Sequence, residues 1–178
     1  MRRRTVLGTG VVGALLLGGA LLASEGAPKT ATANLVGAEG SGVRGKVTFT
    51  EMGDHVMIVA EVEGASSGLH GFPVHEKGDC SAADFTSAGG HFNPTGFDHG
   101  ATGKDPHHAG DFGNLTVGDD GHGRLELHAM GLTVGEGPGS VVGRAVILHE
   151  KADDLTSQPT GAAGARIACG VVEEMPAE

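Results

Sequence analysis

Apolar and polar residues alternate along several short segments of the chain. At positions 56 to 62 the even-numbered residues are Val, Ile, Ala and Val, and Lys46–Thr50 alternates in the same way. A period of two predicts strands that bury one face. Further strand-like segments are Asn114–Val117, Arg124–Ala129, the β-branched run Ser140–Glu150, and Arg166–Val172.

Turn residues separate these segments. Met52-Gly53-Asp54 and Asp119-Asp120-Gly121 predict tight turns. Beyond the N-terminal segment, no window longer than about ten residues has the 3.6-residue apolar period of a helix. Roughly seven or eight short strands favour an all-β fold, either an antiparallel sandwich or a Greek-key barrel. Residues 77–109 and 151–165 resist strand assignment, and long irregular loops of this kind are usually functional.

Composition narrows the class of protein. Among 178 residues there are 33 glycines and 10 histidines but no Trp or Tyr. The glycines follow no collagen-like period, and the chain has no long polar tracts typical of disorder. With 22 acidic against 12 basic residues, the net charge of −10 argues against nucleic-acid binding. The first long loop holds four of the histidines, so we expect a turn-rich β fold that binds metal.

The N-terminus resembles an export signal. Arg2, Arg3 and Arg4 precede an uncharged, apolar and Gly-rich run at positions 6–23, and small residues follow. We expect a signal peptide over residues 1–30, cleaved near Ala23 or Ala33, although an uncleaved anchor would give a similar pattern. The arginines fit a twin-arginine signal or a plain secretory signal equally well. The expected location is periplasmic or extracellular, with no membrane attachment after cleavage.

Cys80 and Cys169 are the chain's two cysteines. In an oxidising compartment a pair of this kind usually forms a disulfide, which we favour over free thiols or a metal-bound pair. Closing a loop of about 90 residues stabilises the fold by at most about 4–5 kcal/mol in the chain-entropy model.

The histidine spacing predicts metal binding. His91, His99, His108 and Asp111 supply three imidazoles and one carboxylate, a four-coordinate set suited to zinc. His75 and His149, each at the end of a strand-like run, form a second group. His91 could serve both groups, because an imidazole has two nitrogens.

Five segments closely resemble the copper/zinc superoxide dismutase family. They occur in the family's order, and the resemblance spans residues 32–173, which we expect to form one domain. Residues 78–84 resemble the bacterial branch in particular. The five segments are Gly68–Glu76, Ser87–Pro94, His108–Asn114, His149–Asp154 and Gly164–Gly170.

The resemblance implies an eight-stranded antiparallel Greek-key β-barrel, an immunoglobulin-like sandwich with two long functional loops. It implies a disulfide between Cys80 and Cys169, and it implies that Asp153 orients ligands of both metals. Arg166 would attract and orient a small anion beside copper, and His91 would bridge the metals and carry a proton. The implied ligands are, for zinc, His91, His99, His108 and Asp111, and for copper, His75, His91 and His149.

One copper-ligand position departs from the family. Where the family reads Gly-Phe-His-Val-His, this chain has Pro73, which offers no side-chain donor. His70 would point to the opposite face of a strand and matches a structural histidine of the family. His107 is a possible local substitute, but as a neighbour of His108 it is expected to be exposed. Proline also removes a backbone N–H, so the strand must lack that bond or lie at an edge.

Two functions fit the sequence. The first is an exported superoxide dismutase that converts superoxide to oxygen and hydrogen peroxide with copper and zinc, weakened by Pro73. The alternative is a zinc-stabilised relative with little or no activity that serves as a copper-binding or structural protein. The loop of residues 151–164 has Lys151 as its only base, so we expect weak electrostatic steering of superoxide. The sequence is compatible with a monomer or a homodimer.

Overall fold

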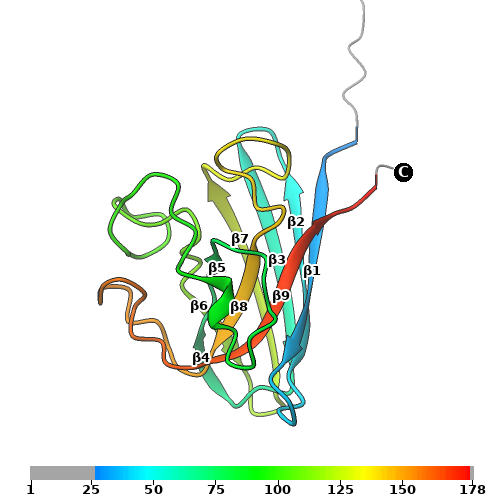
Figure 1. Ribbon diagram of the computed structural model, residues 1–178, viewed down its shortest axis with the longest axis vertical. Coiled ribbons are helices and arrows are strands. Elements are labelled where there is room, and N and C mark those ends of the chain that lie inside the picture. Colours follow the sequence, from blue (N-terminus) through cyan, green and yellow to red (C-terminus); the bar gives the residue numbers. More distant parts are fainter. Residues whose placement is uncertain (1–26, 177–178) are drawn as a thin grey trace, which may run out of the picture.

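The structure is a computed structural model that describes residues 27–176. All nine strands of this part lie in one antiparallel sheet that curls into a barrel (Figure 1). The strands are β1 (Thr30–Gly37), β2 (Arg44–Glu51), β3 (His55–Glu63), β4 (Gly68–Gly71), β5 (Val74–His75), β6 (Asn114–Val117), β7 (His122–Met130), β8 (Ala145–His149) and β9 (Arg166–Glu174). A single 3₁₀ turn, η1 (Thr86–Ala88), accompanies them, and no described helix is long and apolar enough to cross a membrane.

The strand order confirms the all-β Greek-key class. The sheet runs β4-β6-β7-β3-β2-β1-β9-β8-β5, so β3 pairs with β7 and β1 with β9 across long connections. The two outermost strands, β4 and β5, are consecutive in the chain and are separated only by Phe72 and Pro73. This short segment therefore links both ends of the sheet and closes the barrel.

Nine strands are found where eight were expected, and the segment of Phe72 and Pro73 separates β4 from β5. β4 pairs with β6 up to Gly71, whereas β5 pairs with β8 from Val74 onward. Between them, Pro73 has no N–H to donate, although its carbonyl accepts a bond from Ile147 N at 3.0 Å. The missing N–H at proline therefore falls where the chain changes its partner strand from β6 to β8.

The predicted strands are present, with one difference. The alternation at positions 56–62 is the inward face of β3, where Val56, Ile58 and Ala60 are fully buried. The run Ser140–Glu150 was predicted as one strand, but β8 begins only at Ala145. Gly143, at φ 76°, lies in the turn that precedes it.

The predicted signal boundary also overlaps the barrel. The segment of residues 1–26 lies outside the described residues. β1 nevertheless begins at Thr30, and its Ala31 and Ala33 are completely buried.

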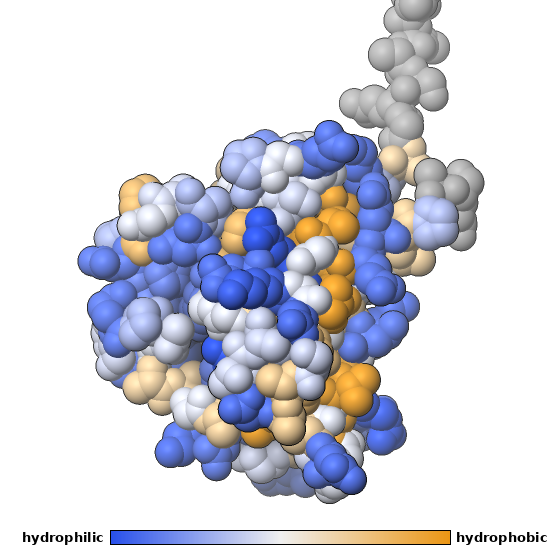
Figure 2. Space-filling view, in the orientation of Figure 1, coloured by the Kyte–Doolittle hydropathy of each residue, from blue (hydrophilic) through white to orange (hydrophobic). Residues whose placement is uncertain are grey.

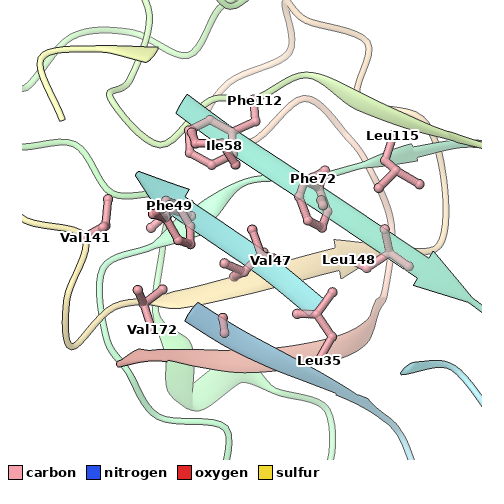
Figure 3. Packing of buried hydrophobic residues seen from close by; sticks show 14 of the residues in the cluster. Leu35, Val47, Phe49, Ile58, Phe72, Phe112, Leu115, Val141, Leu148 and Val172 are labelled. Carbon is pink, nitrogen blue, oxygen red and sulfur yellow. The ribbon is translucent and has the colours of Figure 1, made fainter. Parts of the chain in front are cut away.

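Apolar side chains from both halves of the barrel fill its interior (Figure 3). Phe49, Ile58, Phe72, Leu115 and Leu148 are completely buried. Burying each such side chain contributes roughly 1.5–3 kcal/mol. The core therefore holds the barrel independently of any metal donor.

The two long loops lie on the same side of the barrel (Figure 1). One runs from β5 to β6 and the other from β8 to β9. The predicted disulfide between Cys80 and Cys169 is present and ties the first loop to β9, with a Cα–Cα distance of 5.8 Å. Polar residues cover most of the face over these loops, while apolar residues gather in a band along β1 and β9 (Figure 2).

Candidate metal centre

Four of the expected ligands come together from the first long loop. His91, His99, His108 and Asp111, here called the four-residue group, are buried, and one ligand atom of each lies within 4.8 Å of the others. Asp111 Oδ1 is 2.7 Å from His91 Nδ1, 3.0 Å from His99 Nδ1 and 3.2 Å from His108 Nδ1. Three imidazole nitrogens and a carboxylate oxygen around one point form a donor set for zinc.

Backbone groups orient the carboxylate of Asp111. Its Oδ2 accepts hydrogen bonds from the backbone N–H groups of His108, at 2.8 Å, and Gly100, at 3.1 Å. Burial alone raises the pKa of Asp111, but hydrogen bonds from His91 and from these N–H groups lower it to about 2. Asp111 is therefore ionised at neutral pH, with Oδ1 facing the histidines.

Asp153 supports the four-residue group from the second long loop. Its Oδ1 lies 2.9 Å from His99 Nε2, which leaves His99 Nδ1 free to act as a ligand. Asn114 fixes the backbone of Asp153 by accepting from its N–H at 2.7 Å and donating to its carbonyl at 2.9 Å. Burial lowers the pKa of His99, but the bond with Asp153 and the charge of Asp111 raise it overall.

On the copper side, Asp153 makes none of the expected contacts. It has no hydrogen bond to His75, His91 or His149 in the described structure, whereas the resemblance implied that it orients ligands of both metals. Pro73 has neither a side-chain donor nor an N–H to offer.

A second group consists of His75, His91 and His149, here called the three-histidine group. One ligand atom of each lies within 4.8 Å of the others, and all three side chains are buried. His75 Nδ1 donates to the Gly89 carbonyl at 2.8 Å, and His149 Nδ1 donates to the Gly164 carbonyl at 3.1 Å. Both rings therefore keep Nε2 as the free nitrogen.

His91 joins the two groups. Its Nδ1 contacts Asp111, whereas its Nε2 is free, and its ring centroid is 5.1 Å from that of His75 and 6.4 Å from that of His149. One imidazole thus offers a nitrogen to each group, as the sequence suggested.

Five buried nitrogens find no hydrogen-bond partner within the described part of the chain. Buried polar atoms without a partner are rare, and each one calls for an explanation. The five are His75 Nε2, His91 Nε2, His99 Nδ1, His108 Nδ1 and His149 Nε2. All belong to the two groups, and imidazole nitrogen is a good ligand for both zinc and copper. The donors present therefore fit two metal ions.

Burial keeps the copper-side imidazoles neutral. It lowers the pKa of His75 to about 2 and that of His149 to about 4, and electrostatic repulsion between neighbouring imidazoles adds to the effect in both cases. A neutral imidazole has the free electron pair that a metal requires. Both rings are therefore ready to bind at neutral pH.

Arg166 lies at the start of β9, directly opposite His149 in the pairing with β8. Its guanidinium donates to the carbonyls of Phe85 and Gly89, both at 2.6 Å. Gly89 thus accepts from both Arg166 and His75 and ties the cation to the three-histidine group. Burial lowers the pKa of Arg166, but a guanidinium stays cationic at neutral pH.

Neither spare histidine replaces a ligand at position 73. His70 is buried, with Nδ1 2.7 Å from the His149 carbonyl and Nε2 2.9 Å from the Ser66 carbonyl. It thereby joins β4 to the end of β8, which is a structural position. His107 is half-buried and donates from Nδ1 to the His108 carbonyl at 2.7 Å. Among the described residues, neither side chain belongs to a group that could hold a metal ion.

Comparison with known proteins agrees with this geometry. The family model described as copper/zinc superoxide dismutase (SODC) matches residues 43–172. The chain belongs to the copper/zinc superoxide dismutase family.

A similar solved structure is described as the clock protein EA4. It is 38% identical and has a TM-score of 0.75, and the match covers 82% of this chain and 94% of that one. The family acts on superoxide, and the histidine clusters of this member are of the kind that holds metal.

Several supporting groups had no signal in the sequence. The carbonyls of Gly89 and Gly164 orient two histidines, but a backbone acceptor leaves no trace in residue identity. Asn114 lies within one of the family-like segments, yet only the fold shows that it holds Asp153. Gly161 lies so close to Asp153 and His99 that a Cβ there would collide with both.

Proposed function

We propose that this protein is an exported superoxide dismutase of the bacterial branch, with a complete zinc site and a copper site reduced to three histidines. The observation that carries the proposal is the shared His91. Its Nδ1 contacts Asp111 of the four-residue group, whereas its Nε2 is unpartnered among the described residues. One nitrogen of each of the other four histidines in the two groups is unpartnered as well. A purely structural histidine network would pair these nitrogens with one another or with the backbone.

The residues have distinct roles in this proposal. His91, His99, His108 and Asp111 would hold zinc, and His75, His91 and His149 would hold copper. Bound there, copper would supply one-electron chemistry by alternating between Cu(II) and Cu(I). Arg166 would bind the superoxide anion, since its guanidinium is cationic and fixed by two carbonyls. His91 Nε2 would hold and release the proton needed to form hydrogen peroxide.

Pro73 limits the copper-side donors. When His91 Nε2 carries a proton, only His75 and His149 keep a free nitrogen in this group. The four-residue group does not depend on position 73. We therefore expect weaker copper retention and slower turnover, with zinc binding intact.

Pro73 also supports a second candidate function. A relative that folds around zinc and the disulfide, and holds copper loosely, would need only the four-residue group. Such a protein would be a copper-binding or structural module with little turnover.

The deciding experiment compares wild type with Pro73→His, using Pro73→Ala as the control for loss of the proline ring. Copper and zinc content per chain and superoxide consumption by pulse radiolysis are measured for each. We expect Pro73→His to raise copper retention and turnover while Pro73→Ala does not. Equal turnover per protein in wild type and Pro73→His would refute the impairment. A wild type that holds zinc alone and consumes no superoxide would establish the second function.

We also propose that export cleavage occurs near Ala23 rather than near Ala33. Cleavage after Ala33 would remove half of β1, including two alanines that are completely buried. Mass spectrometry of the mature protein identifies the site. A mature N-terminus after Ala33 would contradict this choice.

A further inference from the structure

Two histidines and two methionines meet on the outer face of the barrel. His55 and Met57 lie on β3, and His128 and Met130 lie on β7, in a cluster here called the outer His–Met cluster. None of the four belongs to the four-residue group or to the three-histidine group.

The strand register places these four residues side by side. In the antiparallel pairing, His55 is opposite Met130, and Met57 is opposite His128. Directly opposite residues have Cβ atoms about 4.5–5.5 Å apart. The diagonal pair is also close, since the ring centroids of His55 and His128 are 4.9 Å apart. Two imidazoles and two thioethers thus occupy one small patch.

The patch faces solvent rather than the core. Val56 and Ile58 alternate with the β3 members and are completely buried, so His55 and Met57 point outward. Met130 is 64% exposed. β6 pairs with β7 only at Gly123, so no described strand lies beyond Met130 at that edge of β7.

The orientation of His55 suits a ligand. Its Nδ1 lies 2.9 Å from Asp54 Oδ1, so with that nitrogen donating, Nε2 keeps its electron pair. Metal-binding histidines commonly donate their other N–H to a carboxylate in this way. His128 has no hydrogen bond from its ring among the described residues and is open at both nitrogens.

The donor types select the metal. Thioether sulfur is a soft ligand that favours Cu(I), whereas zinc sites are built from imidazole, thiolate and carboxylate. The described residues contain just two groups of three or more His, Cys, Asp or Glu suited to a metal, and both are at the buried centre. The outer His–Met cluster has only two imidazoles of the ligand types that zinc prefers. Its other two ligands are the thioether sulfurs of the methionines.

We propose that His55, Met57, His128 and Met130 form a surface binding site for Cu(I), separate from the buried metal centre. His55 Nε2, one nitrogen of His128 and the two thioether sulfurs are its ligands. Asp54 is a positioning residue that fixes the ring of His55. The site gives this chain a second place to hold copper.

The test titrates the zinc-loaded mature protein with Cu(I) under anaerobic conditions, against a chromophoric Cu(I) chelator. The variant Met57→Leu/Met130→Leu removes both sulfurs at nearly constant volume. Met175→Leu removes an exposed methionine outside the cluster and is the matched control. We expect the double variant to bind one Cu(I) fewer than wild type and the control to bind the same number. Asp54→Asn should weaken the site about 10- to 100-fold.

Methyl NMR gives a second measurement that does not depend on the buried centre. Cu(I) should shift the methyl resonances of Met57 and Met130 but leave that of Met175 in place, and Zn(II) should shift none of them. Equal Cu(I) stoichiometry in wild type and the double variant, with unmoved methyl resonances, would overturn the proposal. Shifts of the same methyls by Zn(II) would overturn the selectivity for Cu(I).

Discussion

Replacing Gly161 with alanine should damage the zinc side of the centre specifically. Gly161 has φ 68°, and a Cβ at this position would overlap Asp153 Oδ1 and lie 2.7 Å from His99 Nε2. The substitution therefore forces apart the bond between Asp153 and His99, which is 2.9 Å long. Because the two side chains come from different loops, this bond joins the loops as well as orienting His99.

The expected cost has two parts. Placing alanine at a positive φ costs about 1–2 kcal/mol. Losing a buried hydrogen bond to a charged group costs about 1.5–3 kcal/mol more. The sum is a loss of about 2.5–5 kcal/mol in the free energy of unfolding. Loss of a carboxylate behind a ligating histidine typically weakens metal binding about 10- to 100-fold.

Gly96→Ala is the matched control. Gly96 has φ 71° in the first long loop, and apart from its chain neighbours no atom of the described residues lies within 4 Å of the place that an added Cβ would take. This control carries the backbone cost without the collision. Because the chain has no Trp or Tyr, urea unfolding is followed by circular dichroism, and zinc affinity is measured by chelator competition. If Gly161→Ala costs no more than Gly96→Ala and zinc binds equally tightly, the assigned role of Asp153 is wrong.

The metal centre supports two more tests, one of its histidines and one of the disulfide. In the metal-free protein, His75 and His149 together should contribute a loss of about 3 kcal/mol of stability between pH 6.5 and pH 5. Their folded-state pKa values are about 2 and about 4, so at these two positions the unfolded chain binds more protons than the folded chain as the pH falls. Urea titrations at the two pH values test this, and His149→Gln should reduce the difference; an unchanged difference would contradict it. Cys80→Ser with Cys169→Ser should cost up to about 4–5 kcal/mol and should weaken copper binding, because the released loop carries the Gly89 carbonyl that orients His75. Unchanged copper retention in a dialysis assay would count against that coupling.

The sequence alone determined the class of fold and the composition of the centre. The alternation along β3 arises because Val56 and Ile58 are buried on one side of the sheet. It can therefore be recognised in the sequence without knowing which strands pair with β3. The disulfide pairing required only that the chain has two cysteines and that they are expected to meet an oxidising compartment. The spacing of His91, His99 and His108 within one irregular segment of the sequence indicated a metal site. So many ligand-type side chains so close together in a sequence are otherwise difficult to explain.

Only the tertiary structure decided how these parts meet. The break at Pro73 became a change of partner strand, from β6 to β8, because position 73 lies where the two ends of the sheet meet. The free nitrogen of each histidine was set by carbonyls such as Gly89 O, which belong to the backbone and leave no mark on residue identity. Likewise, His55 and His128 are 73 positions apart in the sequence, and it is the register of β3 on β7 that makes them neighbours.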